Sequence, residues 1–229
     1  MGLTAYSAAV KISSLLLYAN LFATSAFAQI PENSLSFRIG ADQSGANLYK
    51  GQVAAVRLYK RALGKDEIET ITKLKPEAKN ESVAPDYEWL LAQIKKESCP
   101  ASKGKLPATV EGDVAVTKEG VVPCAEFSGG YLVIEDSESI DFTKGFTTDL
   151  WVHPEEGIPT CRFVDKITPG QGDGFLLDIY PANTLRVIVG STVISTAFEY
   201  DGKKWTHVAV TISGSDIKIY INGKQVVAK

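Results

Sequence analysis

The chain reads Asp-Ile-Lys-Ile-Tyr-Ile-Asn-Gly at residues 216–223, and this stretch decides the fold class. Isoleucine occupies every second position of its first six residues, and lysine and tyrosine stand between the isoleucines. Successive side chains of a strand point to opposite faces, so this alternation predicts an antiparallel strand with one buried face. The Asn222-Gly223 pair that follows predicts a tight hairpin turn, because both residues tolerate a positive φ.

Short alternating runs of the same kind continue on the N-terminal side of this stretch. Strands are predicted at Val110–Val116, Tyr131–Glu135, Phe146–Val152, Arg162–Lys166, Phe175–Tyr180, Leu185–Val189, Val193–Tyr200, Trp205–Ile212 and Asp216–Ile221. Two further strands are predicted earlier in the chain, at Ser34–Ile39 and Gln52–Tyr59. Many short strands at regular spacing, separated by turn residues, predict a β-sandwich.

Two short helices are predicted outside these strands. Residues 64–67, Gly-Lys-Asp-Glu, place two acids in the first turn of a helix, where acidic side chains stabilise the helix N-terminus. Residues 73–108 form a connector, and its segment Asp86–Glu97 has apolar side chains at helical spacing. These side chains are Tyr87, Leu90, Leu91 and Ile94. We expect this second helix to pack on the sandwich, because its apolar face is too large to remain in water.

Composition bounds the class of protein. The chain has 229 residues, of which 45% are hydrophobic and 22% charged, which is typical of soluble globular proteins and excludes collagen-like, disordered and disulfide-dense classes. Its formal net charge of −3 is spread without a basic stripe, which argues against nucleic acid and anionic membrane surfaces as partners. No segment approaches the roughly 20 apolar residues of a membrane span.

The N-terminus indicates export. Residues 1–28 contain Lys11, no acid, an apolar centre and a final Ala-Phe-Ala, which is typical of a secretory signal. We therefore expect a secreted, periplasmic or cell-surface protein. In such an oxidising compartment, the odd number of cysteines, Cys99, Cys124 and Cys161, predicts one disulfide plus a free thiol, or a bond to another chain. Which cysteines pair stays open.

A resemblance to a known family rests on four landmarks in order. They are residues 127–133 (Phe-Ser-Gly-Gly-Tyr-Leu-Val), residues 140–142 (Ile-Asp-Phe) with 146–152 (Phe-Thr-Thr-Asp-Leu-Trp-Val), residues 205–209 (Trp-Thr-His-Val-Ala) and residues 219–224 (Ile-Tyr-Ile-Asn-Gly-Lys). Residues 110–229 thereby resemble laminin-G-like, concanavalin-A-like lectin/glucanase jelly rolls. The resemblance implies an all-β fold, a concanavalin-like antiparallel jelly-roll sandwich with one or two short accessory helices.

The order of the family's segments is unusual. Residues 37–42, 49–51 and 56–63 resemble the stretch that ends the family's module, yet here they come first. Either residues 34–72 remain from a preceding tandem module, or the module is circularly permuted. We favour permutation, because a sandwich lacking these strands would expose unpaired edges. Residues 34–72 and 109–229 are then expected to form one domain.

Catalysis is not expected. The superfamily includes glycosidases, which need two positioned carboxylates, but the acidic string at residues 135–141 lacks the Glu-x-Asp-x-x-Glu order and Lys144 stands where the last Glu would follow. We interpret the string as a solvated loop. The chain's two histidines do not indicate a triad, since no Gly-x-Ser-x-Gly elbow is present. His207 is expected to be packed and hydrogen-bonded, and His153 to be exposed.

Metal binding is also disfavoured, and we expect no cofactor. Relatives often hold a structural calcium, but Ser128 and Ala54-Ala55 stand where the resemblance implies acidic ligands. Because calcium prefers several carboxylate and carbonyl oxygens at one point, these departures weaken such a site. Four acids remain in or near loops, Asp42, Asp165, Asp173 and Asp178, and we expect them on the solvated surface.

The resemblance favours a non-catalytic binding module whose partner is a polysaccharide or glycoconjugate. Candidate ligand-binding residues are Tyr180, Asn183, Tyr200 and Asp201, which lie in two predicted turns where an aromatic ring stands beside amide or acid groups. For both tyrosines the alternative is a ring packed over a strand end. The runner-up functions are a protein-adhesion or structural accessory module of a larger surface protein and, after it, a remote glycosidase. Three other aromatic residues, Trp151, Trp205 and Tyr220, are expected in the core.

Overall fold

The structure is a computed structural model that describes residues 32–78, 81–141, 143, 145–158, 160–200 and 202–229. The predicted secretory signal, residues 1–28, lies outside the described residues, as does Asp201. Across these ranges the chain forms no helix of the length and hydrophobicity that a membrane crossing requires.

Strands account for most of the regular structure. Their bounds, with those of the three helical segments, are β1 (Phe37–Ile39), β2 (Gly51–Tyr59), α1 (Lys65–Thr72), β3 (Tyr87–Leu90), η1 (Leu91–Gln93), β4 (Ser98–Cys99), β5 (Ala108–Glu119), β6 (Val122–Ile134), η2 (Glu138–Ile140), β7 (Phe146–Pro154), β8 (Cys161–Lys166), β9 (Phe175–Ile179), β10 (Thr184–Val189), β11 (Thr192–Ala197), β12 (Thr206–Ser213), β13 (Asp216–Ile221) and β14 (Lys224–Ala228).

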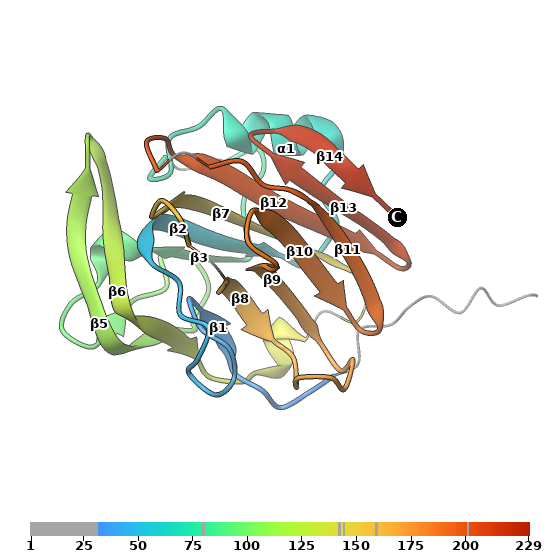
Figure 1. The fold of residues 1–229 in the computed structure, drawn as a ribbon, viewed down its shortest axis with the longest axis horizontal. Coiled ribbons are helices and arrows are strands. Elements are labelled where there is room, and N and C mark those ends of the chain that lie inside the picture. Colours follow the sequence, from blue (N-terminus) through green and yellow to red (C-terminus); the bar gives the residue numbers. More distant parts are fainter. Residues whose placement is uncertain (1–31, 79–80, 142, 144, 159, 201) are drawn as a thin grey trace, which may run out of the picture.

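Among the described residues, fourteen strands form one hydrogen-bonded network, whose main path runs β11-β10-β9-β8-β1-β6-β2-β7-β12-β13-β14. Strand β6 is shared by two layers, because residues 125–127 pair with β2 and residues 132–134 pair with β1. We call β1 and β8 to β11 the front sheet, and β2, β7 and β12 to β14 the back sheet (Figure 1). The pairing is antiparallel throughout, which confirms the predicted all-β fold class.

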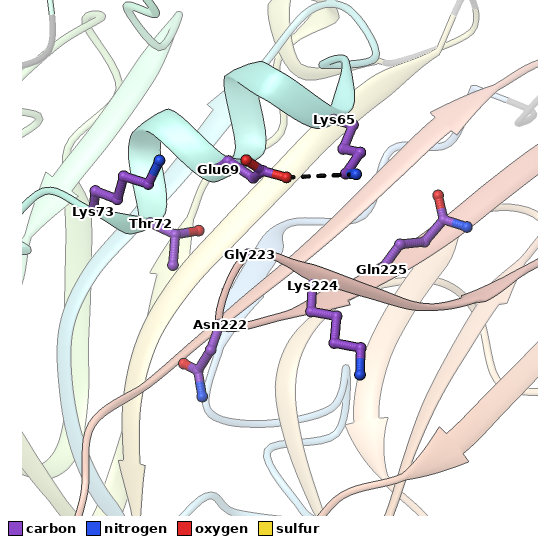
Figure 2. A pocket seen from close by; sticks show the side chains of 8 residues that line it. All are labelled: Lys65, Glu69, Thr72, Lys73, Asn222, Gly223, Lys224 and Gln225. Atoms are coloured by element: carbon purple, nitrogen blue, oxygen red, sulfur yellow. Dashed lines mark ion pairs between the residues drawn. The ribbon is translucent and has the colours of Figure 1, made fainter.

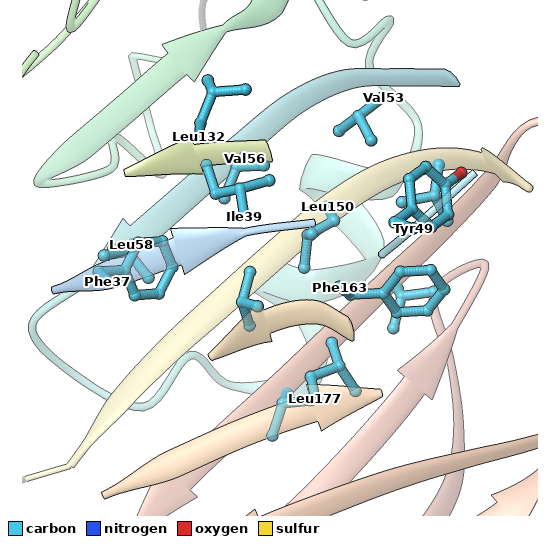
Figure 3. Close-up of a cluster of buried hydrophobic side chains, with 14 of the residues drawn as sticks. Phe37, Ile39, Tyr49, Val53, Val56, Leu58, Leu132, Leu150, Phe163 and Leu177 are labelled. Carbon is cyan, nitrogen blue, oxygen red and sulfur yellow. The ribbon is translucent and has the colours of Figure 1, made fainter. Parts of the chain in front are cut away.

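The main hydrophobic core lies between the two sheets. Figure 3 shows Ile39 of β1 and Val56 of β2 among side chains that come from later strands, including Leu150 of β7 and Leu177 of β9. All four side chains are buried. The burial of large apolar side chains from both sheets is the main term that holds such a sandwich together.

The two early strands are internal members of this network. Strand β1 lies between β6 and β8, and β2 lies between β6 and β7. The register of β2 places Val56 opposite Leu150 on one side and Trp89 on the other. The strands of residues 34–72 therefore bond directly to strands from beyond residue 109.

The predicted helix at Asp86–Glu97 is wrong. Residues 87–90 form strand β3, which pairs with β2, and the 3₁₀ turn η1 and the short strand β4 follow it. Tyr87 and Trp89 both point into the core, where Trp89 stacks on Phe37 at 5.9 Å between ring centroids. The open edge of β2 offers backbone hydrogen bonds that a helix here would leave unmade, and this overrides the helical spacing of the apolar residues.

The expectation of a disulfide is also wrong. The three cysteines are free and fully buried, on β4, β6 and β8 respectively. Burial raises the pKa of Cys99 and of Cys161 to about 12, so neither thiol forms the reactive thiolate at neutral pH. These residues act as small apolar side chains of the core.

The predicted helix after Gly64 is confirmed as α1. Asp66 and Glu67 occupy its first turn, and the Glu67 carboxylate accepts a hydrogen bond of 2.9 Å from the Gly64 amide. Its buried residues Ile68 and Ile71 lie in a second apolar cluster with residues of β12 and β13. Helix α1 thus covers part of the outer face of the back sheet (Figure 1).

Candidate functional site

The outer face of the front sheet carries an alternating pattern of charged and apolar residues. In β9, Phe175, Leu177 and Ile179 belong to the main core, so the residues between them face away from it. Leu176 and Asp178 are these outward residues. The same alternation turns Arg162 of β8 and Arg186 of β10 toward the outer face.

Charged side chains form a continuous row across these strands. The Asp178 carboxylate accepts two hydrogen bonds from Arg186, of 3.0 Å at Oδ1 and 2.7 Å at Oδ2, and it also pairs with Arg162. Arg162 Nε lies 3.1 Å from Asp165 Oδ2, and Gln43 Nε2 donates to Asp165 Oδ1 at 2.9 Å. Burial raises the pKa of Asp165 despite these contacts. The row is fully paired and holds both arginines in fixed orientations.

A groove of about 380 Å³ lies over this row. It is lined by Arg162, Asp165, Ile167, Pro169, Gly170, Gln171, Gly172, Leu176, Arg186, Ile188, Gly190, Ser191 and Val193. Apolar side chains of β9, β10 and β11 alternate in it with the arginines, and the turn at residues 168–171 supplies a wall. A volume of this size with mixed polar and apolar walls suits part of a sugar chain.

Tyr180 lies at the end of β9, beside the charged row. The Arg186 guanidinium stands 4.1 Å from the centre of its ring, and the tyrosine is 49% exposed. The structure places Asn183 in the same turn, with an exposed side chain at φ 61° and its backbone carbonyl bonded to the Phe198 amide. Tyr180 thus presents an aromatic ring that a fixed arginine supports from one side.

Tyr200 has a different environment. Its hydroxyl donates a 2.9 Å hydrogen bond to the Ile158 carbonyl, and its ring packs on the buried Phe198 at 5.4 Å. Burial raises the pKa of this hydroxyl. These contacts are those of a ring packed over a strand end. Asp201, the fourth candidate, lies outside the described residues, so the structure brings together only Tyr180 and Asn183 of the predicted set.

The outer face of the back sheet carries a second charged network, which is covered. Arg57 pairs with Glu88 at 2.8 Å and with Asp149 at 3.4 Å, and His207 Nε2 lies 3.1 Å from Asp149 Oδ1. The other ring nitrogen, Nδ1, lies 2.9 Å from the Thr72 hydroxyl of α1. Burial opposes ionisation of Asp149, but His207 and Arg57 hold its pKa below the usual range.

These contacts settle the expectations for the histidines and tryptophans. His207 is buried and hydrogen-bonded, as predicted. His153 is not exposed, because it is buried with its ring 5.6 Å from that of Trp205. Tyr220 is buried as predicted, whereas Trp151 and Trp205 lie at the outer side of the back sheet and are only partly buried.

In the groove, the two neighbouring aspartates do not form a free catalytic pair. Asp165 and Asp178 lie close together, but the Arg162 guanidinium lies between them and bonds to both. A glycosidase needs that space for the glycosidic oxygen. In the acidic string, Asp136 and Asp141 pair with the buried Lys166 at 2.7 Å and 3.6 Å, so this segment is anchored rather than freely solvated.

The four loop acids are also more engaged than the sequence predicts. Asp42, Asp165 and Asp178 are buried, which corrects the expectation of a solvated surface, and Asp173 accepts a 2.8 Å bond from the Thr168 amide. Hydrogen bonds from Ser44, Ala46 and Asn47 hold the pKa of Asp42 at about 2, although burial alone would raise it. In the described ranges, no group of three or more histidine, cysteine or acidic residues could hold a metal ion.

The two arginines that line the groove and pair with Asp178 were not predicted from the sequence. The available signal was a charged residue at an outward position in each of three adjacent apolar strands, namely Arg162, Asp178 and Arg186. A strand that buries one face accepts charges only on the other face. Cross-strand pairing then brings Arg162 and Arg186 opposite Asp178, and this register is not visible without the fold.

Comparisons with known proteins agree with this architecture. The family model described as concanavalin A-like lectin/glucanases superfamily matches residues 127–229, which run from within β6 to beyond β14 and include the whole groove. No curated protein and no solved structure matches the chain. Residues 127–229 are therefore similar to the concanavalin A-like lectin/glucanases superfamily.

Proposed function

We propose that the protein is a secreted, non-catalytic glycan-binding module, and that the groove over β8, β9 and β10 is its binding site. The observation that carries the proposal is the support of Tyr180 by Arg186. An exposed ring held at 4.1 Å by a guanidinium that Asp178 itself fixes is already oriented for stacking on a sugar. The similarity of residues 127–229 to the concanavalin A-like lectin/glucanases superfamily supports a binding role of this class.

The lining of the groove supports the same conclusion. Sugars present apolar ring faces and hydroxyl groups, and a site for them combines apolar or aromatic surfaces with polar groups at fixed positions. Leu176, Ile188 and Val193 supply apolar surface, while Gln171 and Ser191 can exchange hydrogen bonds with hydroxyl groups. Asn183 adds an exposed amide beside Tyr180.

We propose no catalytic activity because the carboxylates beneath the groove are held in ion pairs and hydrogen bonds. Asp178 is fully buried between two arginines, and Asp165 is buried against Arg162 and Gln43. A carboxylate bound in this way cannot attack an anomeric carbon or hold a proton for a leaving group without first breaking its ion pairs. Hydrolysis of a polysaccharide by the purified protein would contradict this part of the proposal.

A glycan array followed by calorimetry with the best-bound oligosaccharide tests the site. We expect Tyr180→Ala to weaken binding by about tenfold or more, if a sugar ring on Tyr180 contributes as much as the roughly 1–3 kcal/mol of a nucleic-acid base stacked on an aromatic side chain. Tyr180→Phe keeps the ring and is expected to retain most of the affinity. Equal binding by wild type and Tyr180→Ala, or equal losses in both variants, would overturn the assignment.

A second candidate function, protein adhesion, has one observation in its favour. The β5–β6 hairpin projects from the body of the sandwich (Figure 1), and it carries Val121, 86% exposed, and Val116, 49% exposed. Exposed apolar residues on a projecting hairpin are suited to protein contacts. Binding to a protein partner that is lost in Val116→Asp/Val121→Asp but retained in Tyr180→Ala would favour this function.

A further inference from the structure

A second pocket, of about 510 Å³, lies between α1 and the turn that joins β13 to β14. Figure 2 shows the eight residues that line it: Lys65, Glu69, Thr72, Lys73, Asn222, Gly223, Lys224 and Gln225. They come from two elements only, the helix with its last turn and the hairpin. The pocket adjoins the back sheet and shares no lining residue with the groove of the front sheet.

His207 fixes the two sides of this pocket relative to each other. Its backbone amide donates to Asn222 Oδ1 at 2.9 Å, and its carbonyl accepts from the Asn222 amide at 2.8 Å. Its ring Nδ1 lies 2.9 Å from Thr72 Oγ1 on the helix. One buried residue of β12 thus holds both the end of α1 and the hairpin turn, so the pocket is preformed.

Gly223 keeps the space between these two sides open. It is buried with φ at 79°, and a Cβ placed on it would stand 3.4 Å from Thr72 Oγ1. Any larger residue would strain the turn and narrow the gap to the helix. The sequence therefore places its least bulky residue where the hairpin turn approaches the helix.

Most polar groups that line this pocket are cations or hydrogen-bond donors. Lys73 and Lys224 are exposed and have no acidic partner within the described residues, while Lys65 pairs with Glu69 at 3.7 Å. Asn222 and Gln225 use their side-chain oxygens, through bonds from His207 and Tyr220, which leaves their NH₂ groups available as donors. In a chain of net charge −3, this concentration of unpaired donors favours an anionic ligand.

We propose that this pocket binds the carboxylate or sulfate group of an acidic polysaccharide, with Lys73 and Lys224 as its charged contacts. The proposal rests on the glycan-binding function and specifies a ligand class for a second site. The pocket volume accommodates a sugar residue that carries the charged group. Charge-assisted hydrogen bonds from ammonium groups to such oxyanions are stronger than neutral ones. His207 is a positioning residue here, since it acts through Thr72 and Asn222.

Calorimetry with three trisaccharides of equal length tests this: one of uronate residues, one of uncharged sugars that carry sulfate groups, and one of uncharged sugars without sulfate. We expect the wild-type protein to bind at least one charged probe more tightly than the neutral one, and this preference to fall at high salt. Lys73→Gln/Lys224→Gln should weaken the charged probe by about tenfold. The probe that binds distinguishes a carboxylate ligand from a sulfate ligand.

Two matched variants separate a site from a general effect of charge. Lys118→Gln removes an exposed lysine from the β5–β6 hairpin and is expected to leave binding unchanged. Glu69→Gln removes the only acid of the pocket and frees Lys65, so it should tighten binding of the charged probe several-fold. A merely structural role for these residues would not increase affinity.

The proposal is overturned if all three probes bind equally or not at all, or if the double variant behaves like Lys118→Gln. Failure of the proposed function alone has a different signature: charged-probe binding persists in Tyr180→Ala, while that substitution has no effect on the glycan selected by the array. Failure of the pocket alone leaves array binding sensitive to Tyr180→Ala and charged-probe binding insensitive to Lys73→Gln/Lys224→Gln.

Discussion

The outer faces of the two sheets carry similar charged networks, but the network of the back sheet is covered and that of the front sheet lies in an open groove. On the back sheet, Asp149 lies between Arg57 and His207 beneath α1 and the segment after it. On the front sheet, Asp178 lies between Arg162 and Arg186, and the arginine side chains remain 13% and 19% exposed at the floor of an open groove. The same ion-pair chemistry therefore fastens a helix on one face and presents a binding surface on the other.

Both faces depend on the two early strands, and a charge placed in β2 gives the largest expected effect. Val56 is fully buried between β3 and β7, so Val56→Asp should destabilise the fold by more than about 4 kcal/mol. We propose that residues 34–72 and 109–229 form one domain, and one unfolding transition monitored by calorimetry and circular dichroism is then expected for the wild type. Two transitions, with only one shifted by the substitution, would contradict the single domain.

Removal of the covered carboxylate is expected to have the next largest effect. Among the described residues, Asp149→Asn leaves the buried Arg57 with Glu88 as its one acidic partner, and breaking a buried pair in this way typically costs about 3–5 kcal/mol. The free energy of unfolding in urea measures the change. Because the network is away from the groove, the affinity of the folded fraction for the array-selected glycan should be unchanged, and a specific loss of this affinity would show that the two networks are coupled.

On the outer face of the front sheet, removing the carboxylate should lower stability less and weaken glycan binding more. Asp178→Asn is expected to cost about 1–3 kcal/mol of stability, less than Asp149→Asn, because water can reach the arginines that lose their partner. The same variant releases Arg186 from beneath Tyr180 and should weaken glycan binding about as much as Tyr180→Ala does. Urea unfolding and calorimetry on the same samples test both parts. Unchanged affinity would show that Asp178 has only a structural role.

The smallest effect is expected in the loop that precedes β2. The folded pKa of Asp42, about 2, lies below its ordinary value of 3.8, so the ionised carboxylate stabilises the fold above about pH 4 and this contribution is lost as the pH falls through 2. Asp42→Asn should therefore cost about 1–2 kcal/mol at pH 7, with the difference from wild type shrinking toward pH 2. A difference that does not depend on pH would contradict the assignment.

Much of the fold could be predicted because period-two alternation is a local property. The predicted strands from Phe146 to Ile221 are present, with bounds that differ by a few residues. The segment 87–90 could not be predicted in the same way, since Tyr87, Leu90 and Leu91 fit a helix locally and only the edge of β2 selects the strand. The disulfide prediction was wrong for a similar reason, because the positions of the cysteines in the core depend on strand order.

Less of the candidate site could be predicted. Tyr180 and Asn183 were accessible because a turn with an aromatic ring is visible in the sequence. The groove itself depends on which residues of β8, β9 and β10 stand opposite one another, and register across strands is a long-range property. Tyr200 could not be separated from Tyr180 by sequence, since only the contact of its hydroxyl with Ile158 shows it to be packed.

We further propose that the strand order is a circular permutation of the family's order, in which β1 and β2 occupy places that the resemblance assigns to the end of the module. The family match starts at residue 127 and does not include these strands, although they lie between β6, β7 and β8. A solved relative whose last two strands occupy the positions of β1 and β2 would support this origin. A relative with other strands there would contradict it.

Hydrogen–deuterium exchange with and without the best-bound oligosaccharide tests whether the groove over β8, β9 and β10 binds glycan. We predict slower amide exchange on binding in the turn at residues 168–171 and in β10, which contribute residues to the groove, and in the turn at residues 180–184, which carries Tyr180. The amides of the covered network, in β2 and β7, should exchange at the same rate in both states. If exchange at the groove is unchanged while the oligosaccharide is bound, the binding site lies elsewhere and the assignment is contradicted.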